Sequence, residues 1–409
     1  MDTFDVLNPD VYGKGDPARN GLPLDDYARM RETAPCYRQK MGDPLLLPWT
    51  WVLTRYDDVV TVDRDHRRFP SRFGVTLREF EPTLAEHGGK PAMITMDGDD
   101  HVRNRRIVAR GFTPTVIGAF EKRFRDLSTA VLDKALAERQ IDFVHSVAVP
   151  MPLHAICDLM GIPDQDREDV LRWSNAFFVA TDPDYAPSPE EVFAAVGNLW
   201  AYGVTLAEKR RRAPGEDLMS KVAAAFESEQ LSEDELMGMT LLLAGGGTET
   251  TRNALSHGLH ALLRNPDQMA LLREHGDRVL DTAVEEILRY SSPFINFRRT
   301  AAERVVLHGQ TIEPGDRVAI MYTSANFDPE MFPDPERFDL TRSPNPHVAF
   351  GSGRHVCLGA AVARLEIKIA LQELLARTTD IKQLGPIEYV RDSFLHGVKR
   401  LPVELVPAA

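Results

Sequence analysis

The chain has 409 residues, of which 43% are hydrophobic and 27% are charged, and this composition excludes a disordered or fibrous protein. Its formal net charge of -13 argues against a general binder of nucleic acids or membrane surfaces, because both need a dominant basic field. Three scattered cysteines, Cys36, Cys157 and Cys357, are too few for a disulfide framework, so a functional cysteine is expected to act as a thiolate.

Neither a secretory signal nor a membrane span is predicted. The first ten residues contain three aspartates and lack the basic and apolar regions of a signal peptide. The longest uncharged run, from Leu236 to Thr248, is shorter than the roughly 20 apolar residues that a membrane span needs. We therefore expect a cytoplasmic protein. Because no linker-like stretch or internal repeat divides the sequence, we expect a single domain over residues 1–409.

The first part of the chain mixes helix and strand. Pro23 to Glu32 has helical apolar spacing, and Trp51 to Thr54 is a β-branched and aromatic run suited to a strand. From about residue 100 to residue 290 the apolar spacing is nearly all helical. Helix breaks in this region are predicted at Thr113-Pro114, Gly161-Ile162-Pro163 and Asn265-Pro266.

Strands return after Pro293. The runs Arg304 to Leu307 and Arg317 to Tyr322 flank turn signals at His308-Gly309 and Pro314-Gly315, so small hairpins are expected here. A strong helix from about Leu358 to Arg377 and a strand-like tail follow. The pattern predicts a mainly α fold with a minor β portion. The β-containing part is expected over about 1–100 and 293–345, and the helix-rich part over about 100–290 and 346–380.

Cys357 follows a glycine-rich loop, FGSGRHVCLG (residues 350–359), and falls at the start of the last predicted helix. Unpaired N–H groups at a helix start favour an anion, so we expect a thiolate there, and the glycines let the loop lie against a flat ligand. The glycine spacing excludes a dinucleotide or P-loop motif, and the lack of nearby cysteine or paired histidine excludes zinc. A buried structural cysteine is the alternative.

Three successive glycines, Gly245 to Gly247, stand inside the predicted helix that contains AGGGTETT (residues 244–251). That helix opens with the capping box Ser232/Glu235 and ends before Asn265-Pro266. Each glycine costs a helix roughly 1 kcal/mol relative to alanine, so something must compensate. A planar ligand that lies close to the helix and a close helix crossing are both consistent with these residues.

Two further segments carry charge. Glu286 and Arg289 are one helical turn apart, and PERF (residues 335–338) follows downstream. An acid and an arginine at this spacing are common on exposed helices, so the pair alone indicates little. HVRNRR (residues 101–106) is a basic cluster in an acidic protein, which suits either a solvated helix face or the binding of anions.

Taken in this order, the four segments resemble the cytochrome P-450 family. FGSGRHVCLG matches the family's haem-binding pattern FxxGxxxCxG at every defining position, and the resemblance covers essentially the whole chain. It implies the family's triangular-prism fold, with a haem between the helix that contains Gly245 and the helix after the Cys357 loop. It also implies a haem b (iron protoporphyrin IX) cofactor with Cys357 as its axial metal ligand.

The resemblance assigns roles to further residues. Glu249 and Thr250 are the acid–threonine pair that handles O2 and its protons. The other implied haem contacts are His101, Arg105, Arg299, His355, Phe350, Gly351 and Gly359. Glu286, Arg289 and Arg337 are expected to form a structural ion network. Arg103, Arg106 and Arg354 are expected to face the electron donor.

The implied activity is that of a haem-thiolate monooxygenase. It uses O2 and two electrons from a ferredoxin and its ferredoxin reductase, so NAD(P)H acts only through these partners. LNPDVY (residues 7–12), RGFTP (residues 110–114) and HGVKRLP (residues 396–402) look like segments of actinobacterial sterol side-chain and methyl-branched-lipid hydroxylases. A small hydrophobic substrate, such as a steroid side chain or a branched fatty acid, is therefore expected.

Substrate-pocket positions implied by the resemblance are mostly apolar. They are Phe73, Val75, Phe178, Gly245, Gly246, Phe294, Ile295, Phe297 and Phe394. The Gly245-Gly246 run is expected to widen the space over the haem. Alternative functions are a terpene or aromatic hydrocarbon hydroxylase and a haem- or ligand-binding module without turnover. A cysteine hydrolase that uses Cys357 and His355 is disfavoured, because no orienting acid is apparent.

Overall fold

The computed structural model describes residues 3–78, 92–186, 188–228 and 231–408. Its helices are α1 (Pro9–Gly13), α2 (Leu24–Thr33), α3 (Tyr56–Arg64), α5 (Gly98–Ala109), α6 (Pro114–Glu138), α7 (Pro150–Met160), α8 (Arg167–Phe178), α9 (Pro189–Arg212), α10 (Leu218–Glu227), α11 (Glu233–Arg264), α12 (Pro266–Ser291), α13 (Tyr322–Ala325) and α14 (Ala360–Arg377). Its strands are β1 (Cys36–Lys40), β2 (Trp49–Leu53), β3 (Gln140–Asp142), β4 (Asn296–Thr300), β5 (Val305–Leu307), β6 (Gln310–Ile312), β7 (Arg317–Met321), β8 (Thr378–Gln383), β9 (Glu388–Tyr389), β10 (Val398–Arg400) and β11 (Pro402–Pro407). The prediction of a mainly helical fold with a minor β portion is confirmed.

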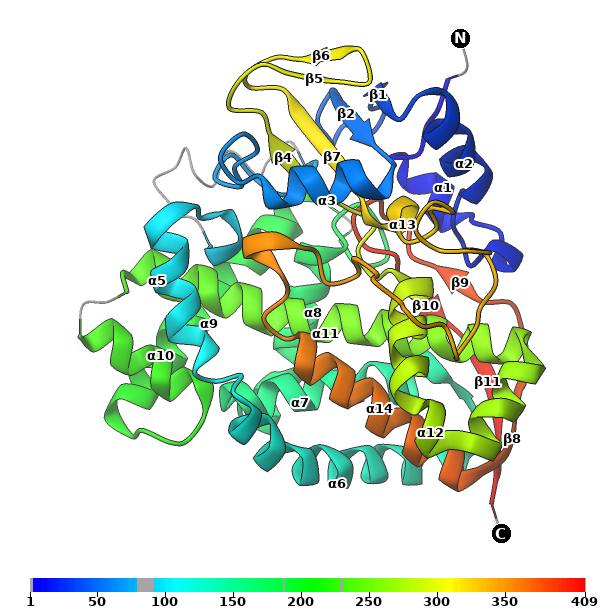
Figure 1. Cartoon of the computed structure of the whole chain (residues 1–409). Helices are drawn as coiled ribbons and strands as arrows, with labels where there is room; N and C mark the ends of the chain where they lie inside the picture. The colour runs from blue at the N-terminus through cyan, green and yellow to red at the C-terminus, as the bar shows by residue number, and fades with distance from the viewer. Residues whose placement is uncertain (1–2, 79–91, 187, 229–230, 409) are drawn as a thin grey trace.

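A four-stranded sheet and its hairpin form one end of the molecule, at the top of Figure 1. The strand order is β1-β2-β7-β4, in which β2 and β7 are parallel and the other pairs are antiparallel. The hairpin predicted at His308-Gly309 is confirmed, because β5 and β6 pair across it. The second hairpin prediction is wrong: β7 follows the Pro314-Gly315 turn but pairs with β2 and β4. Residues 318–321 of β7 are all buried, as expected for a central strand.

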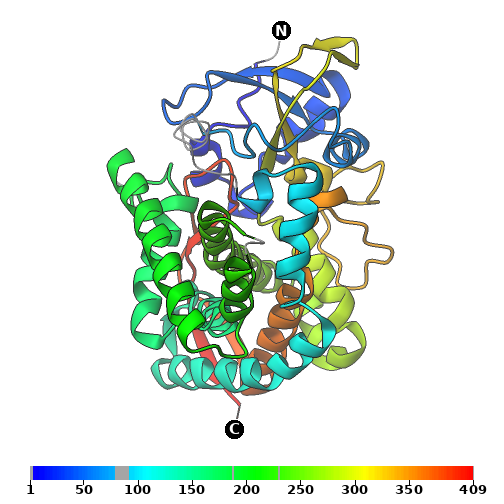
Figure 2. The ribbon, with the colours of Figure 1, turned by 90° about the vertical axis from the view of Figure 1, so that its left-hand side faces the viewer.

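The helical part is built around α11, which runs through the middle of the molecule and is seen nearly end-on in Figure 2. Its N-terminus carries the predicted capping box of Ser232 and Glu235. Helices α7, α8, α9, α12 and α14 pack on it. At Gly258 a Cβ would lie 2.8 Å from the Ile287 side chain, so this glycine lets α12 approach closely. The cost of a glycine inside a helix is offset here by a helix crossing.

A three-stranded sheet, β3-β11-β8, closes the other end of the molecule beside the C-terminus (Figure 1). Its strand β3 interrupts the stretch that the apolar spacing predicts to be helical, and pairs with β11 more than 250 residues later. The predicted breaks at Thr113-Pro114, Gly161 and Asn265-Pro266 all coincide with helix ends. In the described part of the chain, no helix combines the length and apolar character of a membrane span.

Candidate active site

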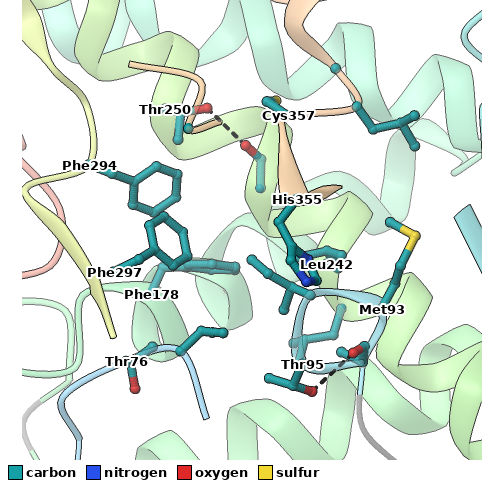
Figure 3. Close-up of a pocket in the computed structure, with 18 of the residues that line it drawn as sticks. Thr76, Met93, Thr95, Phe178, Leu242, Thr250, Phe294, Phe297, His355 and Cys357 are labelled. Carbon is teal, nitrogen blue, oxygen red and sulfur yellow. Dashed lines mark hydrogen bonds between the residues drawn. The ribbon is translucent and has the colours of Figure 1, made fainter. Parts of the chain in front are cut away.

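A cavity of about 960 Å³ lies between α11, α5, β4 and the loop that carries Cys357 (Figure 3). It brings together most of the predicted site residues from segments far apart in the sequence. All eight predicted cofactor-binding residues line it, namely His101, Arg105, Arg299, Phe350, Gly351, His355, Cys357 and Gly359. The predicted catalytic and pocket residues that line it are Thr250, Phe73, Val75, Phe178, Gly246, Phe294, Phe297 and Phe394. Glu249, Gly245 and Ile295 do not line it.

The loop before Cys357 is held in place by one buried carboxylate, Asp63 of α3. Its Oδ2 accepts hydrogen bonds from the backbone N–H of Ser352 (2.6 Å) and from the Tyr322 hydroxyl (3.0 Å). Gly351 and Gly353 have φ values of 69° and 68°, a conformation that glycine adopts without strain. The loop therefore turns tightly, and Cys357 N–H donates back to the Phe350 carbonyl at 2.9 Å.

The Cys357 side chain is exposed to the cavity. The sequence predicted that Cys357 falls at the start of the last helix. In the structure Cys357 precedes α14, which begins at Ala360. Burial raises the pKa of its thiol, whereas the N–H groups of Gly359 and Ala360 and the guanidinium groups of Arg105 and Arg364 oppose that rise. A bound metal cation would deprotonate such a thiol outright. The sulfur thus suits a metal ligand better than a free thiolate.

A basic cluster lies beside the sulfur. The rings of His101 and His355 are 4.4 Å apart between centroids, and Nε2 of the buried His101 has no hydrogen-bond partner among the described residues. Burial and the neighbouring His355 and Arg105 lower the pKa of His101 to about 4. Arg105 Nη2 donates to the Val356 carbonyl at 2.7 Å. Arg299 is buried and paired with Asp63 at 2.6 Å.

These residues fit a haem b. The cavity offers one sulfur that could ligate a metal, an imidazole nitrogen without a partner among the described residues, and two guanidinium groups that could hold a pair of propionate carboxylates. Among the described residues, no group of three or more His, Cys, Asp and Glu side chains could hold a metal by itself. A metal that binds at Cys357 therefore has to bring its remaining ligands with it, as a porphyrin does.

Thr250 and Glu249, the predicted catalytic pair, face different surroundings. The Thr250 Oγ1 donates to the Gly246 carbonyl at 2.8 Å and lies on the cavity side of α11, near Cys357 in Figure 3. Glu249 is fully buried outside the cavity lining, where its carboxylate contacts the guanidinium of Arg252. Burial raises the pKa of Glu249 despite that cation. The carboxyl therefore lies behind the threonine and not in the cavity.

Sequence reasoning missed a second acid, Glu366 of α14. It lines the cavity and is 5% exposed, and burial raises its pKa to about 8 although the Thr251 hydroxyl hydrogen-bonds to it. The signal was present in the sequence. Glu366 lies at helical spacing from the buried Ile369 and Ala370, so it is an acid on the buried face of its helix.

Four phenylalanines form the wall of the cavity. Phe294, Phe297 and Phe394 contact one another with ring centroids 4.8 to 5.2 Å apart. Phe178 completes the wall from the end of α8 (Figure 3). Ile295 was predicted to line the pocket. Its side chain instead packs in the core near the N-terminal helices, on the side of the chain opposite to that of Phe294. The assignment of Ile295 to the pocket is therefore corrected.

The expected widening at the two glycines holds at only one of them. A Cβ at Gly246 would meet no atom within 4 Å, so this position opens onto the cavity. A Cβ at Gly245 would overlap the Phe178 ring, which already fills that space. The missing Cβ at Gly245 therefore makes room for an aromatic side chain and adds no open space to the cavity.

The structural ion network also needs one correction. Glu286 and Arg289 are fully buried and joined by two hydrogen bonds of 2.8 Å. Arg337, the predicted third member, has an exposed side chain, and only its carbonyl oxygen accepts from Arg289. The second guanidinium comes from Arg342, whose Nε lies 3.2 Å from Glu286 Oε2. Arg342 therefore replaces Arg337 in the network.

Comparison with known proteins gives a consistent result. The family model described as Cytochrome P-450 matches residues 204–379. The chain is similar to the methyl-branched lipid omega-hydroxylase of Mycobacterium tuberculosis, with 40% identity over 86% of this chain and 83% of that protein. It is also similar to the steroid C26-monooxygenase of Mycolicibacterium smegmatis, with 35% identity over 95% and 91%. A solved cytochrome P-450 of Mycobacterium marinum in complex with pseudoionone superposes with a TM-score of 0.90, at 33% identity and 99% coverage of both chains.

Proposed function

The chain belongs to the cytochrome P-450 family, and we propose that it hydroxylates a C–H bond of a hydrophobic substrate with O2 and two electrons from a ferredoxin and its reductase. One observation carries the proposal: the Cys357 sulfur, the Thr250 hydroxyl and a basic cluster face one apolar cavity. A binding module without turnover would need the sulfur and the basic cluster, but it would have no use for Thr250.

In this proposal Cys357 ligates the iron of haem b, and His101, Arg105, Arg299 and His355 hold its propionates. When bound, the haem would supply the iron for O2 chemistry, and the Cys357 thiolate would donate electron density to that iron. The N–H groups of Gly359 and Ala360 tune the sulfur, since they stabilise negative charge on it.

The chain's own residues then handle protons and exclude water. Thr250 Oγ1 carries a proton at the cavity surface and is oriented by the Gly246 carbonyl. Glu249 lies behind it, where burial raises the pKa of this carboxyl and the charge of Arg252 opposes that rise. The aromatic wall keeps bulk water away from the substrate. Protons taken up from solvent are proposed to reach the cavity through these side chains.

For the substrate we propose a steroid side chain or a branched fatty acid, in keeping with the names of the similar lipid omega-hydroxylase and steroid C26-monooxygenase. The apolar cavity with its four phenylalanines supports this class. The complex of the similar Mycobacterium marinum protein with pseudoionone supports a terpene or aromatic hydrocarbon as the second candidate.

The ferredoxin is proposed to dock on the face that carries the Cys357 loop, in the cytoplasm where NAD(P)H feeds its reductase. Arg106 and Arg354 are exposed there. Arg103, the third residue expected to face the donor, is instead engaged by Glu235 at 2.6 Å and by Asp100 at 2.9 Å, and we withdraw it from the docking surface.

Turnover with isotopically labelled O2, a ferredoxin, its reductase and NADPH tests the proposal. One labelled oxygen atom is expected in the product from a steroid or branched fatty acid, as measured by mass spectrometry. A red protein that gives no labelled product with any donor would favour the binding module. A colourless preparation with one reactive thiol would reject both.

Thr250→Ala adds a test of the proton route. The variant should keep its haem and bind substrate, yet release most electrons as hydrogen peroxide, because the cavity hydroxyl is missing. Thr250→Ser is the matched control, since it retains the hydroxyl. Equal ratios of product to consumed NADPH in the Ala, Ser and parent proteins would reject the role of Thr250.

A further inference from the structure

Two ion pairs join α12 and α14, which pack side by side (Figure 1). Asp281 pairs with Lys368 at 2.6 Å, and Glu285 pairs with Arg364 at 2.6 Å. Each partner of the second pair is four residues, or about one helical turn, from its counterpart in the first. The Glu285–Arg364 pair is the nearer of the two to the Cys357 loop, because Arg364 precedes Lys368 on the helix that follows this loop.

The carboxylate of Glu285 is held by two neighbours. It accepts from Arg364 Nε at 2.6 Å and from Arg364 Nη2 at 2.8 Å, which is a bidentate arrangement. His347 Nδ1 accepts from the Ala349 N–H at 3.3 Å, so a neutral imidazole carries its proton on Nε2, which lies 3.0 Å from Glu285 Oε2. Burial alone would raise the pKa of Glu285, but these donors lower it to about 2. The pair is therefore ionised at neutral pH.

The guanidinium of Arg364 lies over an aromatic ring of the Cys357 loop. Its Cζ is 4.5 Å from the centroid of the Phe350 ring, and Phe350 lines the cavity. The Phe350 carbonyl accepts the backbone N–H of Cys357 at 2.9 Å. The charge of Arg364 also acts on the sulfur, where it opposes the rise that burial causes in the pKa of the Cys357 thiol. Phe350 therefore links the cation to the residue that carries the sulfur.

The two charges of the pair affect a metal at Cys357 with opposite signs. When a haem iron takes up one electron from a reductant such as dithionite, its positive charge falls by one. A nearby cation therefore favours the reduced form, and a nearby anion favours the oxidised form. Arg364 and Glu285 offset each other in part, so the removal of either one should shift the reduction potential.

We propose that Arg364, held over Phe350 by Glu285, is a positioning residue that raises the reduction potential of the haem, and that Glu285 limits this rise. Arg364 acts on the iron through the Cys357 loop and does not touch the reacting atoms. The inference rests on the proposed function for the haem at Cys357. It is separate from docking of the ferredoxin, because the potential is a property of the protein without its donor.

Titration of the haem-loaded protein with dithionite, without ferredoxin or substrate, measures the midpoint potential. Arg364→Gln is expected to lower the equilibrium constant for reduction about three- to tenfold, because the charge acts through partly exposed and therefore screening surroundings. A tenfold change corresponds to about 59 mV for this one-electron couple. Glu285→Gln should raise the constant by a similar factor, since it removes the anion and leaves the cation. With both substitutions the potential should fall between those of the two single variants.

The neighbouring ion pair supplies matched controls. Lys368→Gln and Asp281→Asn make the same changes of charge on the same two helices, about one turn farther from the Cys357 loop. Asp281 is 83% exposed, against 29% for Glu285, so solvent screens the outer pair more strongly, and the constant should change by less than about twofold. Arg364→Lys keeps the charge and should also stay within about twofold of the parent. All variants should keep the thiolate-type carbon monoxide spectrum, which checks that Cys357 still ligates the iron.

Shifts of the same sign in Arg364→Gln and Glu285→Gln, or shifts no larger than those of the two controls, would overturn the proposal. An ion pair with only a structural role would lower the thermal midpoint in both variants and leave both potentials unchanged. If one variant does not bind haem, the sign and size of the shift in the other still decide, in comparison with its control.

Failure of the proposed function would look different. A parent protein that forms no labelled product, while its variants show the expected shifts, would reject the monooxygenase alone. Product formation together with equal potentials in the parent and all variants would reject the role of Arg364 alone. A protein that binds no haem would reject both.

Discussion

At the scale of single residues, one carboxylate joins the two parts of the site. Asp63 holds the loop before Cys357 through Ser352 and also pairs with Arg299, which lines the cavity at the basic cluster. Its place in the sequence, nearly 290 residues before the loop, gives no hint of this role. Because Asp63 is 3% exposed and accepts four hydrogen bonds, the loop before Cys357 and the Arg299 guanidinium are fixed relative to each other.

Replacement of Cys357 by alanine tests the metal ligand. The side chain faces the cavity, so Cys357→Ala should fold, but it should lose the thiolate-type difference spectrum of the reduced protein with carbon monoxide. Cys36→Ala, at a buried position of β1, is the control and should keep that spectrum. Survival of the spectrum in Cys357→Ala would assign the ligand elsewhere.

Glu366 predicts a pH dependence of stability. Its pKa is about 8 in the folded chain against an ordinary value of 4.5, so the folded state keeps a proton that the unfolded chain loses between these values. The contribution of this carboxyl to the free energy of unfolding is therefore complete below pH 4.5. It is lost as the pH rises towards 8, by at most about 1.4 kcal/mol per pH unit.

Glu366→Gln removes this loss, because the amide does not titrate. The thermal midpoint of the variant minus that of the parent should rise with pH between 4.5 and about 8 and level off above. Glu138→Gln, at an exposed position, is the control. A difference that stays constant over this range would show that Glu366 is ionised in the folded protein.

At the scale of elements, the ends of helices were predicted well from local sequence signals. The pairing of strands from distant segments was not predicted. The capping box of α11 and the Pro breaks before α6 and α12 depend on neighbouring residues, and all coincide with observed ends. The partners of β3 and β7 are set by tertiary contacts, which a local pattern does not contain. The site followed the same division: the residues of the Cys357 loop were predictable, and Glu366 could have been found from its place among apolar residues, whereas Asp63 and Arg342 were not predictable.

The network at α12 gives a stability prediction. Glu286→Gln leaves the buried guanidinium of Arg289 without its anionic partner, so we expect a loss of about 3–5 kcal/mol in unfolding free energy and loss of haem on mild heating. Arg337→Ala is the matched control, and as an exposed side chain it should change stability by no more than about 0.5 kcal/mol. Thermal unfolding measures both. Equal losses would restore Arg337 to the network in place of Arg342.

At the scale of the whole molecule, the charge is unevenly distributed. The chain carries a formal charge of -13, yet exposed arginines lie on and beside the Cys357 loop: Arg354 of the loop itself and Arg64 of α3. A Cβ at Gly353 would lie 3.0 Å from the Arg64 backbone, which shows how closely α3 and the loop meet. A local positive field on an acidic protein attracts an acidic partner to that face and repels it elsewhere.

Arg354→Glu is therefore expected to slow reduction by an acidic ferredoxin about tenfold at low salt, because electrostatic attraction sets much of the association rate. The deficit should shrink as salt is added and screens the charges. Lys382→Glu on β8 makes the same change in net charge at the far end of the molecule and is the control (Figure 1). Stopped-flow reduction at several salt concentrations measures both. If the two variants slow the reaction equally, net charge governs the encounter, and the arginines around Cys357 do not form the docking surface.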